Sequence, residues 1–283
     1  MLANKNISEI RYSVIDHHSM WGWENHQITP EEADVVFVWN DFEREKEVKN
    51  WQKEGKKVVV FEHGWNSFFD YELNNKPHIA DGYMALGVNS KKSLIRSGVD
   101  ENKILISGNK NFDNLESTPK ENLIPKVLYT TLHWFSDKRD FNNQKLASII
   151  KTLGPYSDIC VKTMINSKVD IPKEIRYEWF SDIYENKTLF SDMAKNLSEY
   201  DIILTPKEST FDFIALLVGK RVFRIAEQNE YRSPSDPKVR NILPISEIST
   251  NLFFDELKIL VDMKDELAKS SNINEILKWV KNL

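Results

Sequence analysis

Residues 200–225 read YDIILTPKESTFDFIALLVGKRVFRI, and this stretch decides how the rest of the chain is interpreted. Residues 202–205 are a short apolar run rich in isoleucine, which is typical of a strand. Residues 210–218 form a longer apolar run typical of a helix, and residues 222–225 are again strand-like. Strands that alternate with helices are the signature of a mostly parallel sheet covered by helices. The stretch therefore predicts an α/β fold.

The same alternation fills the first part of the chain. In residues 1–115 we expect strands at 11–15, 35–39, 57–61, 82–86 and 104–106, and helices at 42–54 and 90–97. Gly55 and Gly98 follow these two helices, and glycine just beyond the last turn is a common stop signal. Residues 116–125 contain two prolines and alternating charge without periodicity, so we expect a linker there.

A second alternating series follows in residues 126–283. We expect strands at 127–130, 158–162, 175–180, 202–205 and 222–225, and helices at 142–153, 189–197 and 210–218, with closing helices at 253–268 and 273–281. Two open α/β sheets in tandem predict two Rossmann-like domains that face each other across a cleft. Ligands of such sheets bind beyond the carboxyl ends of the strands.

Composition limits the functional classes. The 283 residues carry 38 Lys and Arg against 43 Asp and Glu, and the resulting net charge of -5 argues against a protein that coats DNA. The single cysteine, Cys160, lies in a strand-like run and predicts a buried thiol without a disulfide. The first residues lack an apolar signal core, and the longest apolar runs are shorter than the ~20 residues of a membrane span. We expect a cytoplasmic protein; a peripheral place at the inner membrane surface stays open.

Polar side chains gather after the strands of the first domain, where α/β proteins hold their ligands. His63 follows the strand at 57–61 and is a candidate general base, because Glu62 beside it is able to orient or charge the imidazole. A histidine held by structural hydrogen bonds is the alternative. Asp16 and His18 follow the first strand and offer acceptor contacts or another base; a loop with exposed histidines is the simpler interpretation.

A phosphate site is the second hypothesis. Ser209 and Thr210 open the helix at 210–218, so their hydroxyls and the free N–H groups of the first turn point at one anion, with Glu208 in the same polar turn. An ordinary N-cap without a ligand explains the pattern equally. Lys162 ends a strand in the same domain and would bring a positive charge to the phosphate; a solvated lysine is the alternative.

Several familiar fingerprints are missing from the sequence. Neither a Gly-x-Gly-x-x-Gly loop nor a Gly-Lys-Ser/Thr loop occurs, which argues against an NAD or P-loop protein, and no Gly-x-Ser-x-Gly elbow is present. The six histidines lack the spacing of metal ligands, and no Asp-x-Asp site is convincing. We therefore expect no metal and no cofactor apart from a substrate.

Short motifs between residues 58 and 225 resemble those of the CDP-glycerol glycerophosphotransferase-like and surface-polysaccharide glycosyltransferases. In the first half they are Glu62-His63-Gly64, Ala80-Asp81-Gly82, Ser107-Gly108-Asn109 and Phe112-Asp113. In the second half they are Val127-Leu128-Tyr129-Thr130-Thr131, Asp201-Ile202-Ile203-Leu204-Thr205, Ser209-Thr210 and Gly219-Lys220-Arg221-Val222.

The resemblance implies a GT-B fold, with an acceptor domain at 1–115 and a nucleotide-donor domain at 126–283. It implies a metal-independent transferase of polysaccharide biosynthesis, which moves a sugar or glycerol-phosphate-like group to an acceptor hydroxyl. His63 is then the catalytic base, Ser209 and Thr210 bind the donor phosphate, and Lys162 matches the lysine of a Lys-x-His-Pro motif. The acceptor would be a glycan, a lipid-linked molecule or modified DNA.

The sequence departs from this pattern after Lys162. Thr163-Met164-Ile165 replaces the histidine and proline, which disfavours CDP-glycerol and favours a nucleotide sugar such as a UDP-sugar. His133 is a candidate substitute for the missing histidine, and Trp179 and Phe180 are candidates for the donor base. Three alternatives stay open: an epimerase or hydrolase of the same fold, a transferase acting on DNA bases, and a nucleotide-binding homologue without activity.

Overall fold

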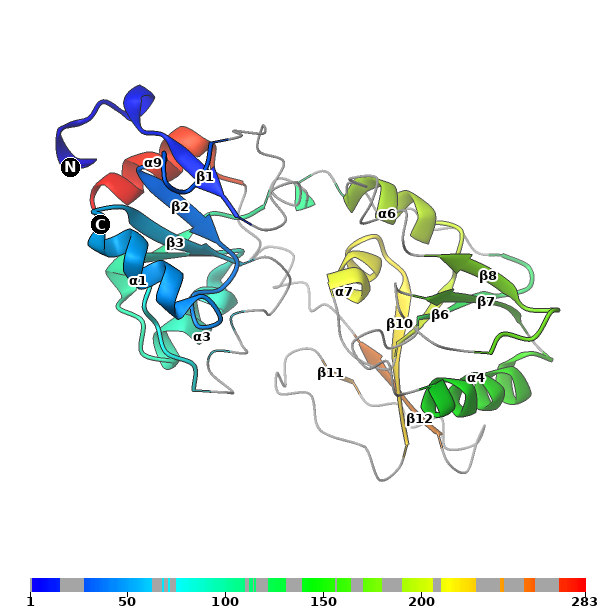
Figure 1. The fold of residues 1–283 in the computed structure, drawn as a ribbon. Helices are drawn as coiled ribbons and strands as arrows, with labels where there is room; N and C mark the ends of the chain where they lie inside the picture. The colour runs from blue at the N-terminus through cyan, green and yellow to red at the C-terminus, as the bar shows by residue number, and fades with distance from the viewer. Residues whose placement is uncertain are drawn as a thin grey trace. The chain divides into compact units, whose positions relative to one another are not determined.

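The computed structural model describes residues 2–15, 28–62, 68, 71, 75–109, 112–113, 115, 122–130, 139–155, 157–163, 170–179, 190–205, 210–227, 240–241, 252–257 and 270–283. The chain divides into two compact units (Figure 1). The first unit consists of Met1–Asn114 together with Asp265–Leu283, and the second of Leu115–Lys264. Each unit is built around its own sheet.

The sheet of the first unit is parallel and has the strand order β1-β2-β3-β4-β5. Its strands are β1 (Tyr12–Val14), β2 (Val35–Val38), β3 (Lys57–Phe61), β4 (Gly82–Ala85) and β5 (Ile104–Ile106). Strands of a parallel sheet are covered on both faces, which explains the uninterrupted apolar runs of β2 and β3. The helices α1 (Glu45–Lys53) and α3 (Val88–Arg96) bury Val48, Trp51 and Leu94 in one core of this unit.

The last helix, α9 (Ile273–Lys281), belongs to the first unit. It begins with a capping box in which Asn272 accepts the N–H of Glu275 at 3.0 Å. Its apolar side chains Ile276, Leu277 and Val280 are buried in a second core with alternate residues of β2, β3 and β4. The prediction that residues 273–281 close the second domain is therefore wrong. The first sheet needs an apolar cover for this face, and the end of the chain supplies it.

The second unit holds a seven-stranded sheet with the order β11-β12-β10-β9-β6-β7-β8. Its strands are β6 (Lys126–Thr130), β7 (Asp158–Thr163), β8 (Arg176–Trp179), β9 (Ile202–Thr205), β10 (Arg221–Glu227), β11 (Arg240–Asn241) and β12 (Leu252–Leu257). The strands from β10 to β8 are parallel, and β12 pairs antiparallel with both β10 and β11.

Strand β12 corrects a second prediction, because residues 253–257 were expected to begin a helix. The edge of β10 is a row of open backbone groups, and pairing with residues 252–257 satisfies them. The remainder of the expected helix, residues 258–268, lies outside the described residues. The helices of this unit are α4 (Arg139–Leu153), α6 (Phe190–Leu197) and α7 (Thr210–Leu217).

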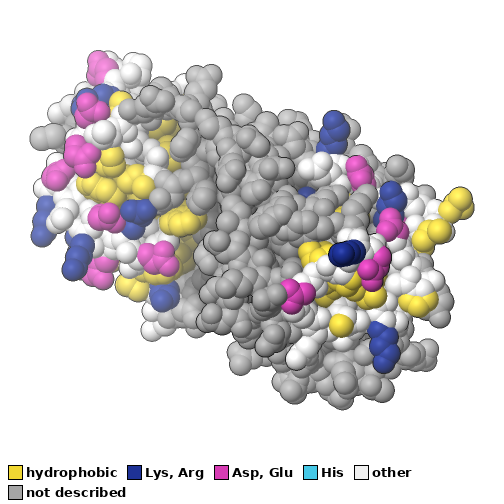
Figure 2. Space-filling model, turned by 45° about the vertical axis from the view of Figure 1, so that its right-hand side comes forward, with side chains coloured by type: hydrophobic (Ala, Val, Ile, Leu, Met, Phe, Trp, Pro, Cys, Tyr) yellow, Lys and Arg dark blue, Asp and Glu magenta, His cyan; other side chains and the backbone are white. Residues whose placement is uncertain are grey.

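The α/β prediction is confirmed, since nearly every expected strand and helix has a counterpart within a few residues. On the face shown in Figure 2, described acidic and basic side chains are interspersed. Within the described ranges, no helix combines the length and apolar character needed to cross a bilayer.

Candidate functional site

The carboxyl ends of β6, β7 and β9 lie side by side in the second unit, because these strands are parallel neighbours. Thr130 ends β6 and pairs with Lys162 near the end of β7. Thr205 ends β9, and α7 begins five positions later at Thr210. Lys162 and the start of α7 thus lie at the carboxyl edge of the sheet, where ligands of such sheets bind.

Lys162 is a buried residue with 4% exposure, so the interpretation as a solvated lysine is wrong. Its ammonium nitrogen lies 5.8 Å from the centre of the Phe211 ring, in the first turn of α7. The contact shows that Lys162 reaches the helix start that the sequence paired with it. Lysine is rarely buried without a charged or polar partner. The charge of a buried lysine also acts more strongly on a nearby charge than that of an exposed lysine.

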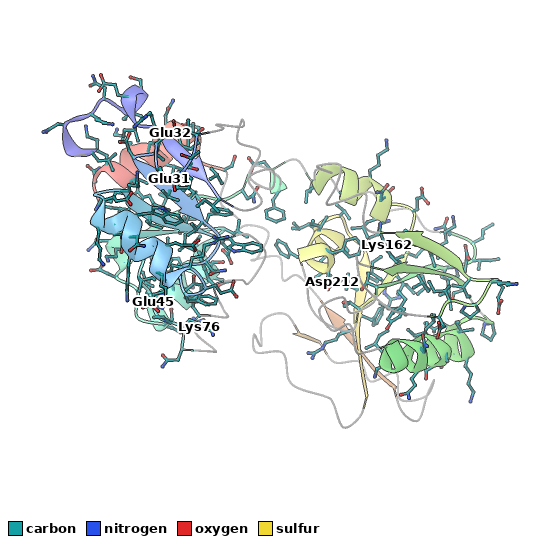
Figure 3. The ribbon with its side chains drawn as sticks, viewed as in Figure 1. Glu31, Glu32, Glu45, Lys76, Lys162 and Asp212 are labelled. Carbon is teal, nitrogen blue, oxygen red and sulfur yellow. The ribbon has the colours of Figure 1, made fainter. Side chains whose placement is uncertain are left out.

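Asp212 is a buried acid that the sequence analysis missed. It lies in the first turn of α7 with 1% exposure, and Figure 3 shows it and Lys162 in the second unit. A carboxylate is stabilised at this end of a helix by the helix dipole. The signal was present in the sequence, because Ser209 and Asp212 have the spacing of a capping box. Asp212 therefore places a buried carboxyl group in the turn where the helix amides would attract a phosphate.

The threonines beside Lys162 are also buried. Thr130 has 8% exposure, and its hydroxyl donates to the Leu204 carbonyl at 3.3 Å. Thr205 has 2% exposure. Two hydroxyls and one ammonium group thus lie at the ends of three adjacent strands, above an apolar core.

In the first unit, Glu62 follows β3 and is fully buried. Its Oε2 accepts the backbone N–H of Leu86 at 2.8 Å, which joins the end of β3 to the turn before α3. Among the described residues, its Oε1 has no hydrogen-bond partner.

Burial raises the pKa of Glu62 to about 7. The Leu86 amide, the Ser90 hydroxyl and the Phe68 amide offset part of this increase in pKa, because they stabilise the ionised form. A carboxyl that titrates near neutrality is suited to proton exchange under physiological conditions. Glu62 is therefore an acid that titrates near neutral pH, and it directly precedes the predicted base His63 in the sequence.

Many predicted site residues lie outside the described residues. These are Asp16, His18, His63, His133, Phe180, Glu208 and Ser209. Thr210 opens α7, and Trp179 ends β8, where it pairs with Thr163. Their assigned roles stay predictions. Within the described ranges, no group of three His, Cys, Asp or Glu side chains is placed to hold a metal ion.

Asp41 is the hub of a further polar cluster, which the sequence analysis missed. Its buried carboxylate accepts the Tyr71 hydroxyl at 2.8 Å and the Tyr83 hydroxyl at 2.5 Å. It also accepts the N–H groups of Ile79 and Ala80 at 2.8 and 2.9 Å. Burial first, and then the charge of Asp41, raises the pKa of both phenols above their usual range. With four donors on one carboxylate, the cluster is a structural element of the core.

No protein-family model matches the sequence, and a search of curated proteins gives no match. Among solved structures, the chain is similar to Anabaena HepE in complex with UDP and glucose, with 11% identity over 68% of this chain and a TM-score of 0.39. It is also similar to the Methanocaldococcus jannaschii UDP-GlcNAc 2-epimerase, with 19% identity over 68% of this chain and a TM-score of 0.47. A third match is the wall teichoic acid polymerase TagF, with 14% identity over 69% of this chain and a TM-score of 0.41.

The chain covers 58%, 60% and 55% of these three structures, which is less than two thirds of their length. At these identities and TM-scores, the activity of this chain has to be inferred from its own residues.

Proposed function

We propose that the chain is a GT-B-type glycosyltransferase, which moves a sugar from a nucleotide-activated donor, such as a UDP-sugar, to an acceptor hydroxyl without a metal ion. The observation that carries the proposal is the burial of Lys162 against the first turn of α7, at the carboxyl edge of the second sheet. A buried cation at this edge suits the phosphate of a nucleotide.

In this reaction the acceptor oxygen forms a bond to the activated carbon of the donor. The bond between that carbon and the phosphate oxygen breaks, and its electron pair leaves with the nucleoside diphosphate. The charge that develops on the phosphate would be stabilised by Lys162 and by the hydroxyls of Ser209 and Thr210. Stabilisation of the leaving group in a site with little water is the main catalytic contribution that we assign to the second unit.

The proton of the acceptor hydroxyl would pass to His63. Glu62 supports this role, because a carboxyl with a pKa of about 7 exchanges protons readily at neutral pH. We assign Glu62 a positioning and proton-balancing role through His63. A second contribution of Glu62 is structural, since it holds the Leu86 amide.

The first experiment is calorimetric titration of the protein with UDP, CDP, GDP, ADP and dTDP. We expect one nucleotide to bind, and Lys162→Met to weaken its binding about ten-fold or more. The matched control is Lys126→Met, because Lys126 lies on β6 at the opposite end of the same sheet. Equal loss in both variants, or binding of no nucleotide, would overturn the donor site.

The second experiment measures turnover with the nucleotide sugar selected by the titration. His63→Ala is expected to abolish transfer and to leave donor binding unchanged. Release of a monosaccharide or epimer without an acceptor would instead identify a hydrolase or epimerase. Donor binding without turnover over a broad acceptor panel would identify a binding protein.

Modified DNA is the least supported acceptor. Acidic and basic side chains are interspersed on the described surface in Figure 2, and the chain has a net charge of -5. Binding to DNA that falls steeply with salt would reverse this judgement.

A further inference from the structure

The strand register of the second unit aligns polar residues across the carboxyl edge of the sheet. Arg224 of β10 pairs with Thr205 of β9, and Thr130 of β6 pairs with Lys162 of β7. The residues just before the two threonines, Tyr129 and Leu204, pair with each other, so the threonines occupy the next positions on neighbouring strands. We call these four aligned residues the polar row: Arg224, Thr205, Thr130 and Lys162.

The polar row lies on one face of the sheet. Residues adjacent in a strand point to opposite faces, and the neighbours of the row residues are packed in the core beneath α4. These neighbours are Tyr129, Val161, Leu204, Phe223 and Ile225. The row is therefore on the face away from that core. The contact between Lys162 and Phe211 places the first turn of α7 on the same face.

Acids occupy the register positions just outside the two cations. Asp255 on β12 pairs with Arg224, and Glu178 on β8 pairs with Lys162. From β12 to β8, the residues at this level of the six strands are therefore an acid, a cation, two threonines, a cation and an acid. The register thus frames the two threonines with one cation on each side.

Two cations three strand spacings apart stand about 14 Å from each other at the backbone. Both side chains are long, so they are able to approach an anion over the threonines from opposite ends. The buried Asp212 carboxyl already occupies the first turn of α7, so we assign the attraction of a phosphate to side chains of the sheet. Arg224 is the other basic residue of the polar row, and its Nε is buried.

We propose that Arg224 is the second cation of the phosphate site and makes it selective for two linked phosphates over one. This inference rests on the proposed function for the identity of the ligand, a nucleoside diphosphate or its sugar ester. Lys162 contacts one phosphate as a point charge, and the planar guanidinium of Arg224 takes the other with paired N–H donors. The threonine positions mark the centre of the site.

The test compares inorganic pyrophosphate with orthophosphate, and UDP with UMP, by calorimetric titration of the full chain. Arg224→Met is expected to weaken binding of the diphosphate ligands about ten-fold and to change binding of the monophosphate ligands less than about two-fold. Lys162→Met is expected to weaken all four. The matched control is Arg221→Met. Arg221 lies three positions before Arg224 on the same strand, so it points to the opposite face of the sheet, where it stacks on Phe223.

Arg224→Lys keeps the charge without the paired donors, so it is expected to retain part of the preference for diphosphates and serves if Arg224→Met does not fold. An unchanged ratio of diphosphate to monophosphate affinity in both Arg224 variants would overturn the inference and leave the donor site intact. Pyrophosphate binding that depends on Arg224, with no binding of any nucleotide, would support the row and overturn the proposed function. Absence of both kinds of binding would overturn both.

Discussion

Gly82 on β4 leaves the space that Trp279 of α9 fills. A Cβ atom at Gly82 would lie 2.6 Å from Trp279 Cη2 and 2.5 Å from Leu283 Cδ1, both far inside normal contact. A side chain at residue 82 would therefore force Trp279 or Leu283 to move. This contact joins the returning end of the chain to the unit that its beginning forms.

Gly82→Ala is expected to lower the free energy of unfolding of the first unit by about 1–3 kcal/mol, since the methyl group displaces Trp279 from a packed core. Denaturant unfolding followed by tryptophan fluorescence measures the loss. Adding Leu283→Ala to the variant removes one of the two clashing groups and is expected to restore part of the stability. A Gly82→Ala protein as stable as the wild type would show that α9 does not pack against β4 in this way.

Glu62→Gln is expected to remove a pH dependence of stability. Below the ordinary value of 4.5 the carboxyl is protonated in both states, and above about 7 it is ionised in both. Between these values only the unfolded chain loses the proton, so the wild type loses stability as the pH rises, by up to about 3 kcal/mol. Urea unfolding across this range should show the wild type falling relative to Glu62→Gln. The exposed Glu174→Gln serves as control, and parallel pH profiles of all three proteins would contradict the burial of Glu62.

Asp41→Ala is expected to destabilise the first unit by about 4 kcal/mol or more, because two backbone N–H groups and two phenols lose their buried acceptor. Tyr83→Phe removes only one of these donors and is expected to lower stability by about 1–2 kcal/mol. Thermal and denaturant unfolding give both values. Equal effects of the two substitutions would mean that Asp41 is not the hub.

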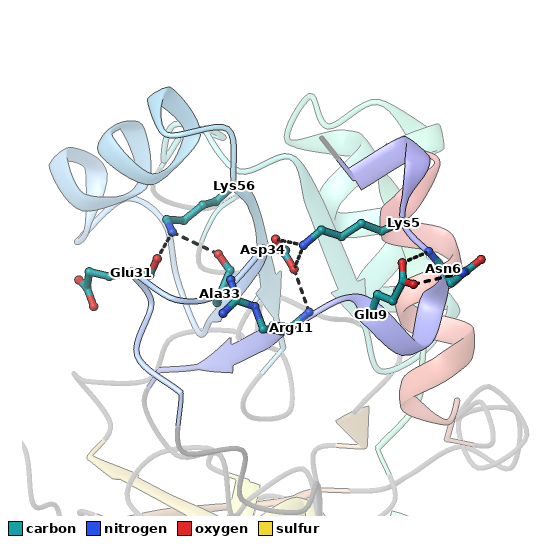
Figure 4. A network of polar contacts seen from close by, with 8 residues as sticks. All are labelled: Lys5, Asn6, Glu9, Arg11, Glu31, Ala33, Asp34 and Lys56. Atoms are coloured by element: carbon teal, nitrogen blue, oxygen red, sulfur yellow. Dashed lines mark hydrogen bonds and ion pairs between the residues drawn. The ribbon is translucent and has the colours of Figure 1, made fainter.

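Asp34 ties the N-terminal segment to the sheet (Figure 4). Lys5 donates to both carboxylate oxygens at 2.7 and 2.8 Å, and the Arg11 N–H donates at 3.0 Å. Burial acts to raise the pKa of Asp34, but the bonds from Lys5 and Arg11 outweigh it and lower the pKa. Asp34→Asn is therefore expected to lose about 1 kcal/mol near neutral pH.

This difference between the wild type and Asp34→Asn should shrink as the pH falls below 3.8, because the unfolded chain then binds a proton at Asp34 that the folded carboxylate takes up only below its lowered pKa. Unfolding at several pH values measures it. Glu45→Gln, which breaks an exposed ion pair with Lys49 on α1, is the control and is expected to have less effect. A difference that persists unchanged in acid would argue against the Lys5 bond.

The candidate site was predicted from the sequence only in part. Lys162 and the start of α7 were paired because Lys162 ends one strand and α7 follows another strand of the same sheet, and parallel strands place their carboxyl ends together. Asp212 and Arg224 were missed for different reasons. Asp212 could have been found from the sequence, because it carries a capping signal. The place of Arg224 depends on the register between β9 and β10, which no local pattern specifies.

The sequence by itself determined the order of strands and helices as far as β10, since the spacing of apolar residues, the glycines after helices and the polar turns act over a few neighbouring residues. The short valine-rich runs of β2 and β3 favour buried parallel strands. Tertiary structure alone decided where α9 packs, why residues 252–257 form a strand, and which charges become buried. An amphipathic segment fits any apolar face of the right shape, and the pKa of Glu62 is raised by a burial that only the folded structure creates.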